Sequence, residues 1–189
     1  MNTPNKLTIL RILLVPVFLA FLLIGAFPYH NVFALIVFIV ASITDSLDGH
    51  LARKNNQITT FGKFLDPLAD KILVLSAMIC FVELSYVSAI VVVIMIAREF
   101  MVTSLRLVAA AGSGKVIAAG ILGKIKTVIQ MVSLTAILLL CAVSDFVALS
   151  QWLSIPVIAE TLMWISAIAS VISGGEYLWK NRKLVSQFE

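Results

Sequence analysis

Four aspartates stand close together in the segment DSLDGHLARKNNQITTFGKFLDPLAD, which covers residues 45–70. Asp45 and Asp48 are three residues apart, and Asp66 and Asp70 are four residues apart. In a helix, both spacings bring the two side chains of a pair onto one face. The short stretch between the pairs predicts two antiparallel neighbouring helices whose aspartates lie at comparable depth. We therefore expect all four carboxylates to converge.

Four crowded carboxylates repel one another and resist removal from water, so cations must be part of such a site. Oxygen ligands favour Mg²⁺ or Mn²⁺ over zinc, and two divalent ions balance four negative charges. A pair of such ions suits chemistry at phosphorus, where the ions bind the attacking and the leaving oxygens. The alternative, in which these aspartates only neutralise basic residues between helices, is disfavoured because four acids on one membrane hairpin are rare.

The rest of the chain is strongly apolar. Of its 189 residues, 61% are hydrophobic and only 13% are charged, and the mean hydropathy is +1.07. Uncharged runs such as 12–29 and 127–144 are long enough to cross a hydrocarbon core of roughly 30 Å as helices. The composition therefore predicts an all-α integral membrane protein. Cys80 and Cys141 fall in apolar runs, which favours buried thiols over a disulfide or a metal site.

Helix starts and breaks predict six transmembrane helices in a single domain over residues 1–189. Thr3 and Pro4 predict a short N-terminal juxtamembrane helix before the first span. We expect the first span to remain in the protein, because no clear cleavage site follows it. The predicted spans cover residues 8–27, 32–53, 62–82, 87–109, 124–144 and 153–178.

The basic residues predict the orientation, because Lys and Arg accumulate in cytoplasmic segments. Of the 14 basic residues, all except Arg98 lie at or near the side that carries both termini. We therefore expect both termini to be cytoplasmic. The net charge of +4 suits an anionic leaflet and anionic substrates, and it requires no nucleic-acid partner.

The motif resembles the signature of the CDP-alcohol phosphotransferase family, which is DxxDGxxAR followed after eight residues by GxxxDxxxD. Every position matches. The matching residues are Asp45, Asp48, Gly49, Ala52, Arg53, Gly62, Asp66 and Asp70. The resemblance implies a fold of six membrane helices, usually a homodimer, with an active site that faces the cytoplasm.

The resemblance also implies a role for each motif residue. All four aspartates would bind two metal ions, Mg²⁺ or Mn²⁺, and Asp70 would also act as the general base toward an acceptor alcohol. The CDP group would lie against Gly49, Ala52, Arg53 and Gly62, together with Thr8 and Asn5. The implied chemistry is an in-line attack on the phosphorus next to the lipid, with CMP leaving.

Four segments, which extend beyond the motif on both sides, resemble bacterial family members that join CDP-diacylglycerol to glycerol 3-phosphate in the cell membrane. These segments are PNKLTILRILLVP, FGKFLDPLADKILVLSAMI, IAREFMVTSLRLVAA and GKIKTVIQM. An acceptor with its own phosphate requires a second cationic pocket. The candidate phosphate-binding residues are Lys63, Arg98, Arg106, Lys124 and Lys126. Inositol phosphate, serine and a second phosphatidylglycerol remain open as alternative acceptors.

A divalent-cation transporter is the rival class, because clustered intramembrane aspartates also bind transported ions. A transport path requires polar groups through both leaflets. The outer halves of the predicted spans are nearly bare, with Glu83, Asp145 and Glu160 at or near the outer boundary. This asymmetry favours an enzyme.

Overall fold

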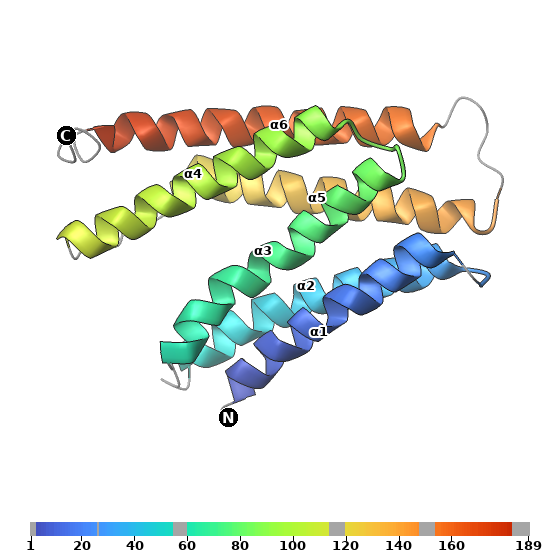
Figure 1. Ribbon diagram of the computed structural model, residues 1–189, viewed down its shortest axis with the longest axis horizontal. Helices are drawn as coiled ribbons and strands as arrows, with labels where there is room; N and C mark the ends of the chain where they lie inside the picture. The colour runs from blue at the N-terminus through green and yellow to red at the C-terminus, as the bar shows by residue number, and fades with distance from the viewer. Residues whose placement is uncertain (1–2, 26, 55–59, 114–119, 148–153, 183–189) are drawn as a thin grey trace.

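The computed structural model describes residues 3–25, 27–54, 60–113, 120–147 and 154–182, without the side chains of residues 3–7, 45–54, 60–68, 70 and 109–113. Six helices and no strand make up this described part of the chain (Figure 1). The helices are α1 (Thr3–Ile24), α2 (His30–Lys54), α3 (Thr60–Glu83), α4 (Ala89–Ser113), α5 (Ile121–Ser144) and α6 (Ile155–Lys180).

The helices agree with the six predicted spans to within a few residues, but the separate N-terminal helix is wrong. Helix α1 continues without a break from Thr3 to Ile24. Pro4 is the second residue of α1, where a helix does not need its missing N–H, so the proline starts the long helix and no second helix is required. Gly25, with a φ of +56°, follows the last residue of α1 in a left-handed conformation that glycine adopts easily.

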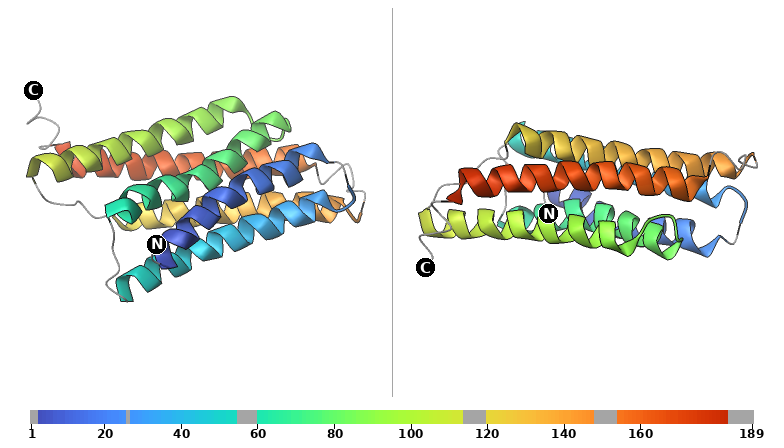
Figure 2. Two further views of the ribbon diagram at one scale, coloured as in Figure 1. Left: turned by 60° about the horizontal axis from the view of Figure 1, so that its bottom comes forward. Right: turned by 90° about the horizontal axis from the view of Figure 1, so that it is seen from above.

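The six helices run up and down, so their ends gather at two opposite ends of the molecule (Figures 1 and 2). We call the end where α2 finishes and α3 begins the motif end. Helices α1 and α5 also begin there, and α4 and α6 finish there. We call the opposite end, where α1, α3 and α5 finish, the turn end. Helix α1 packs against α2 and α3, while α5 packs against α2 and α6, and α4 packs against α6.

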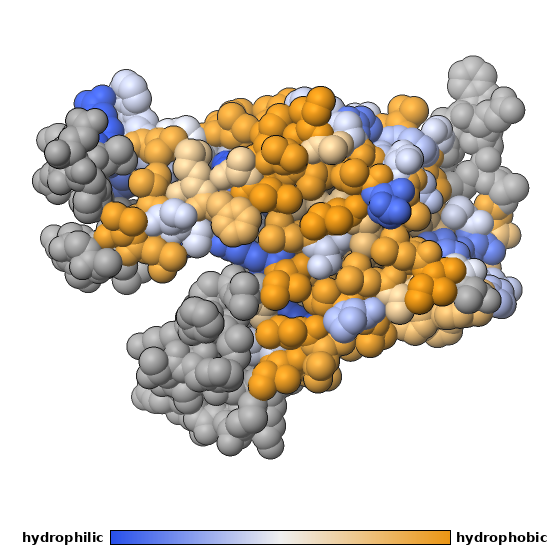
Figure 3. Space-filling view, in the orientation of Figure 1, coloured by the Kyte–Doolittle hydropathy of each residue, from blue (hydrophilic) through white to orange (hydrophobic). Residues whose placement is uncertain are grey.

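All six helices contribute to one apolar core. Phe18 of α1 and Phe38 of α2 are completely buried, with ring centroids 5.8 Å apart. Met78 of α3, Leu134 of α5 and Met163 of α6 are completely buried in the same core. The exposed surface is also strongly hydrophobic over much of the face in Figure 3. A chain with apolar residues both inside and outside is suited to a lipid environment.

Within the described part of the chain, α5 and α6 are long and apolar enough to cross a membrane. They have 24 and 26 residues and mean hydropathies of 2.1 and 1.9. The apolar stretches of α1 and α2 are shorter, at Thr8–Ile24 and His30–Thr44. Polar motif residues occupy the last turns of α2 and the first turns of α3, which shortens their apolar parts. The helices are confirmed, and six complete crossings stay a prediction.

At the turn end, Asp145 binds the N-terminus of a helix that lies far away in the sequence. Its Oδ2 accepts hydrogen bonds from the backbone N–H groups of Asn31 (3.1 Å) and Val32 (3.3 Å). Its Oδ1 accepts a third bond, from Asn31 Nδ2, at 2.7 Å. The first N–H groups of a helix have no partner within the helix, so this carboxylate caps α2 and connects it to the end of α5.

Glu160 of α6 does the same for α4. Its carboxylate accepts bonds from both the N–H and the hydroxyl of Ser88, each at 2.7 Å, and from Trp164 Nε1 at 2.9 Å. Two of the three acids that were expected near the outer boundary, Asp145 and Glu160, therefore act as caps between helices.

The Asp145→Ala substitution removes three hydrogen bonds and leaves the backbone N–H of Asn31 without this partner, whereas the N–H of Val32 keeps its bond to the carbonyl oxygen of Tyr29. We expect it to lower the free energy of unfolding by about 1–3 kcal/mol. Glu83→Ala is the matched control, because Glu83 lies at the same end, is exposed, and makes no hydrogen bond or ion pair within the described part of the chain. Thermal unfolding of the purified variants in detergent measures both effects. Equal melting temperatures for the two variants would contradict the capping role.

Candidate active site

The aspartate motif lies on two helices that meet at the motif end. Helix α2 carries Asp45 and Asp48 in its last three turns, and α3 carries Asp66 and Asp70 in its first three turns. Both stretches are helical, so each pair has the spacing that places two side chains on one helix face. The side chains of these four aspartates lie outside the described residues, and so do those of Asn5, Gly49, Ala52, Arg53, Gly62 and Lys63. Their assigned roles stay predictions.

The donor chemistry of the motif fits a divalent metal. The motif offers only carboxylate oxygens at these helical spacings, and hard cations such as Mg²⁺ and Mn²⁺ prefer such ligands. Among the side chains that the structure describes, no group of three or more His, Cys, Asp or Glu residues forms a rival metal site.

A cavity of about 210 Å³ lies on the core side of the motif and is lined in part by Arg11 of α1, Ser42 of α2 and Leu73 of α3. Ser42 precedes Asp45 by three residues, and Leu73 follows Asp70 by three residues, so the cavity is about one helical turn deeper than the motif. Arg11 is only 2% exposed. Thr8, one turn before Arg11, is completely buried. In the sequence, Arg11 was only one of the basic residues that predict the orientation in the membrane. In the structure, its charge is buried about one helical turn deeper than the aspartate motif.

A second cavity, of about 330 Å³, lies between α4, α5 and α6 and is closed on one side by Lys71 of α3. We call it the cationic pocket. Five basic and two acidic side chains line it, which gives a formal charge of +3. These residues are Lys71, Arg98, Arg106, Lys126 and Lys180, with Glu99 and Glu176. Because Lys71 directly follows Asp70 in the chain, the cationic pocket is adjacent to the aspartate motif.

Arg98 uses all three of its guanidinium nitrogens in bonds, and it is only 9% exposed. Its Nη1 contacts Glu99 Oε1 at 2.9 Å, its Nε donates to the carbonyl oxygen of Ser170 at 2.9 Å, and its Nη2 donates to Ser173 Oγ at 2.8 Å. Glu99 also forms an ion pair with the buried Lys126 of α5. Arg98 therefore faces the interior of the bundle and pairs with Glu99. The pairing fixes α4 against both α5 and α6.

Gly174 allows this contact between α4 and α6. A Cβ atom at Gly174 would lie 3.1 Å from Arg98 Cγ and 3.3 Å from Arg98 Nε, which is closer than ordinary van der Waals contact. A Cβ atom at the next residue, Gly175, would meet nothing within 4 Å. The first glycine of the pair therefore has a packing role that the second does not share.

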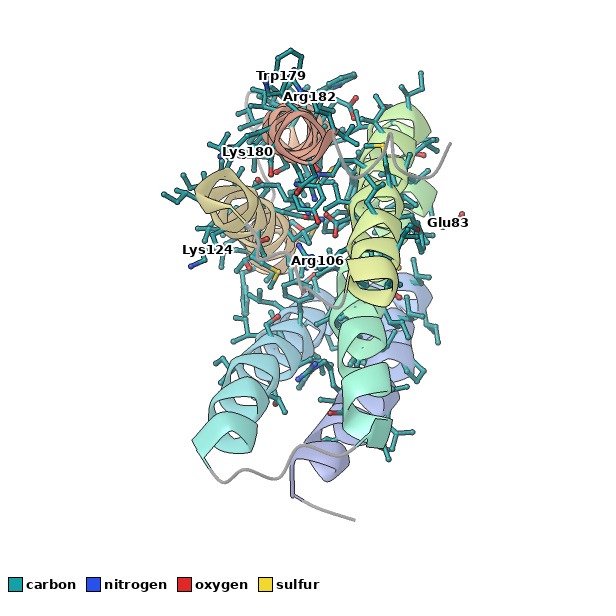
Figure 4. All side chains as sticks on the ribbon, turned by 90° about the vertical axis from the view of Figure 1, so that its left-hand side faces the viewer. Glu83, Arg106, Lys124, Trp179, Lys180 and Arg182 are labelled. Carbon is teal, nitrogen blue, oxygen red and sulfur yellow. The ribbon has the colours of Figure 1, made fainter. Side chains whose placement is uncertain are left out.

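The other predicted phosphate-binding residues differ in position. Figure 4 looks onto the motif end, and there Arg106 lies between α4 and α5 while Lys124 points outward. Arg106 lines the cationic pocket, and its Nε is buried without a hydrogen-bond partner within the described part of the chain. Lys124 is exposed and does not line the pocket. The structure thus brings Arg98, Arg106 and Lys126 together and leaves Lys124 outside.

The sequence analysis did not identify several residues that line the pocket. Lys71 donates a hydrogen bond to the hydroxyl of Thr103, and Lys180 forms an ion pair with Glu176. Tyr177 of α6 also lines the pocket. A signal was present in the sequence, because polar residues recur every three or four positions along the otherwise apolar α6. These residues are Ser166, Ser170, Ser173, Tyr177 and Lys180.

The structure has an apolar helical bundle with an aspartate motif on two adjoining helices. This arrangement agrees with the class of membrane phosphotransferase that was predicted from the sequence. Residues 1–172 match the CDP-alcohol phosphatidyltransferase family, and the chain belongs to that family. The predicted family is therefore confirmed. Members are integral membrane proteins that use divalent metal ions.

Three curated relatives carry the same name, CDP-diacylglycerol–glycerol-3-phosphate 3-phosphatidyltransferase. The Bacillus subtilis protein is 44% identical over 191 residues, which cover 95% of both chains. The Rickettsia bellii protein is 38% identical, with 93% of both chains covered. The Haemophilus influenzae protein is also 38% identical, with 94% of this chain and 91% of its own chain covered.

Substitution of Gly174 tests the contact between α4 and α6. We expect Gly174→Ala to lower the free energy of unfolding by about 1–3 kcal/mol, because the added methyl group must displace Arg98 or separate the helices. Gly175→Ala should leave it unchanged or raise it by up to about 1 kcal/mol, since the site is open and alanine favours a helix over glycine. Thermal unfolding of both variants in one detergent gives the comparison. A Gly174→Ala variant as stable as Gly175→Ala would show that Arg98 is not held closely against α6.

Proposed function

We propose that this protein transfers the phosphatidyl group of CDP-diacylglycerol to sn-glycerol 3-phosphate and releases CMP. The carrying observation is the cationic pocket, which adjoins the aspartate motif through Lys71 and has a formal charge of +3. Such a pocket suits an acceptor that carries a phosphate of its own. The names of relatives that align with more than 90% of the chain support the same acceptor.

In this proposal Asp45, Asp48, Asp66 and Asp70 hold two divalent ions, Mg²⁺ or Mn²⁺. Such ions supply positive charge for the diphosphate of the lipid and for the oxygen of the leaving CMP. The CDP group lies against Gly49, Ala52, Arg53 and Gly62, with Thr8 and Asn5 of α1. The small residues among them allow a nucleotide to approach the helix backbone closely.

Asp70 is the proposed general base. It takes the proton from the free primary hydroxyl of glycerol 3-phosphate as that oxygen attacks the phosphorus next to diacylglycerol. A new oxygen–phosphorus bond forms, and the bond from that phosphorus to the oxygen of CMP breaks. The position of Asp70 directly before Lys71 supports this role, because a phosphate held in the cationic pocket lies next to the base.

The acceptor phosphate is assigned to Arg106 and Lys126, which line the cationic pocket, together with Lys63. Arg98 lines the pocket too, and it also positions Lys126 through the Glu99 carboxylate that both residues contact. Lys124 is exposed beside the pocket, where it adds to the positive potential that attracts an anionic substrate.

We further propose a single domain over residues 1–189 that crosses a bacterial cell membrane six times and forms a homodimer. The basic residues concentrate at the motif end, which supports a cytoplasmic site and cytoplasmic termini. At the turn end, Asp145 and Glu160 are used as helix caps. These two acids therefore do not favour the cation-transport alternative.

Release of CMP by the purified protein is the test of this function. With CDP-diacylglycerol and Mg²⁺, we expect release that depends on glycerol 3-phosphate and is lost when the metal is chelated. The Asp70→Asn variant, which should bind the CDP-lipid without turnover, is the inactive control. Release with inositol phosphate or serine in place of glycerol 3-phosphate would change the assigned acceptor, and release with none of them would refute the enzyme assignment.

Replacement of Arg106 tests the acceptor pocket. We expect Arg106→Ala to raise the KM for glycerol 3-phosphate by about tenfold or more, because a charge-assisted hydrogen bond to phosphate is lost. The KM for CDP-diacylglycerol should change much less. Lys124→Ala, on the outward side of α5, is the matched control and should stay within about twofold for both substrates. Equal effects of Arg106→Ala on the two substrates would refute a separate acceptor pocket.

A further inference from the structure

Two buried polar groups of the cationic pocket have no hydrogen-bond partner within the described part of the chain. One is the hydroxyl of Tyr177 on α6, and the other is Nε of Arg106 on α4. Tyr177 is only 8% exposed, so water reaches little of it. A buried donor without a partner destabilises a protein unless water, an ion or a ligand completes the bond, and a donor that also lines a cavity is open to a ligand.

The other basic residues that line the pocket already have partners. Arg98 and Lys126 contact Glu99, Lys180 contacts Glu176, and Lys71 donates to Thr103. Arg106 Nε and the Tyr177 hydroxyl differ from these groups, because each is buried and has no partner within the described part of the chain.

The packing of α4 on α6 places these two residues at similar depth. Arg98 bonds to Ser170 and Ser173, and both helices run from the turn end to the motif end. Arg98 is thus matched to residues 72 and 75 positions later in the chain. The same separation matches Arg106 to the part of α6 just beyond Tyr177, within about one helical turn, or about 5 Å along the axis. One ligand group the size of a phosphate can therefore accept bonds from both residues.

We propose that the Tyr177 hydroxyl and Arg106 together bind the phosphomonoester of the acceptor alcohol, and that Tyr177 selects phosphorylated acceptors over unphosphorylated ones. The identity of the acceptor rests on the proposed function above. A phosphomonoester offers several oxygens to a guanidinium and a hydroxyl at once. An acceptor without the phosphate leaves both donors unpaired, and such a loss gives strong discrimination.

The test compares two variants that each remove a buried, unpartnered hydroxyl from α6. Tyr177→Phe removes the hydroxyl that lines the pocket. Ser170→Ala removes one that is completely buried and also unpartnered within the described part of the chain but does not line the pocket. We expect Tyr177→Phe to raise the KM for glycerol 3-phosphate about tenfold, with kcat within about twofold and the KM for CDP-diacylglycerol unchanged. Ser170→Ala should leave all three values within about twofold.

The two kinetic arms distinguish the acceptor phosphate from the diphosphate of the lipid. An effect of Tyr177→Phe on CDP-diacylglycerol alone, or no effect on either substrate, overturns the proposal. If Tyr177→Phe does not fold, Arg106→Lys replaces it, and the same split between the two substrates is expected because Lys lacks the guanidinium fork.

A binding measurement separates this proposal from the proposed reaction. Inorganic phosphate should raise the melting temperature of the wild-type protein in detergent, and this rise should be smaller in Tyr177→Phe than in Ser170→Ala. That result supports the phosphate site even if glycerol 3-phosphate does not stimulate CMP release, in which case the proposed acceptor is wrong. Equal rises in the two variants overturn the role of Tyr177.

Discussion

A charge inside an apolar bundle has to be paired, because neither lipid nor hydrocarbon side chains can replace the water around it. Arg98 meets this constraint with bonds from each of its three guanidinium nitrogens, to Glu99 and to two serines of α6. Glu99 in turn holds Lys126 of α5. The register of three helices thus follows from the partners of one buried cation, and the cationic pocket is the space that these helices enclose.

The sign of the charge changes over a short distance at the motif end. Helices α2 and α3 bring four aspartates, while the neighbouring pocket has an excess of positive charge. Opposite charges in adjacent sites suit a reaction between two phosphate-bearing molecules, because each phosphate needs its own cations. The difference in charge also keeps each molecule in its own site. In the proposed reaction the lipid diphosphate uses metal ions, whereas the acceptor phosphate uses side chains.

The helices and the motif could be predicted from sequence because they depend on local patterns. Apolar runs of fixed length and the aspartate spacings are visible without knowledge of the neighbouring helices. The pocket was harder to predict because it depends on which face of each helix turns inward. Lys124 and Lys126 look equivalent in the sequence. Side chains two positions apart on a helix, however, point in directions that differ by about 200°. The structure buries Lys126 and exposes Lys124.

Tyr177 was missed for a related reason. A single tyrosine near the end of an apolar helix is usually an interfacial residue, whereas the structure places this one at the cationic pocket, on the same side of α6 as the serines that Arg98 contacts. The separate N-terminal helix was predicted from Thr3 and Pro4, but a proline in the first turn is compatible with one long helix. Local signals start a helix, and they do not decide how far it continues.

The caps at the turn end have a consequence for the order of assembly during synthesis. Helix α2 carries half of the aspartates, yet the carboxylate that caps its N-terminus belongs to a residue made 114 positions after Asn31. A nascent chain that has produced α2 and α3 therefore still lacks the bonds that Asp145 accepts from Asn31 and Val32 at the start of α2. Those bonds form only after α5 has been made and Asp145 has reached its place. The N-terminus of α2 is therefore capped late, together with the second half of the protein.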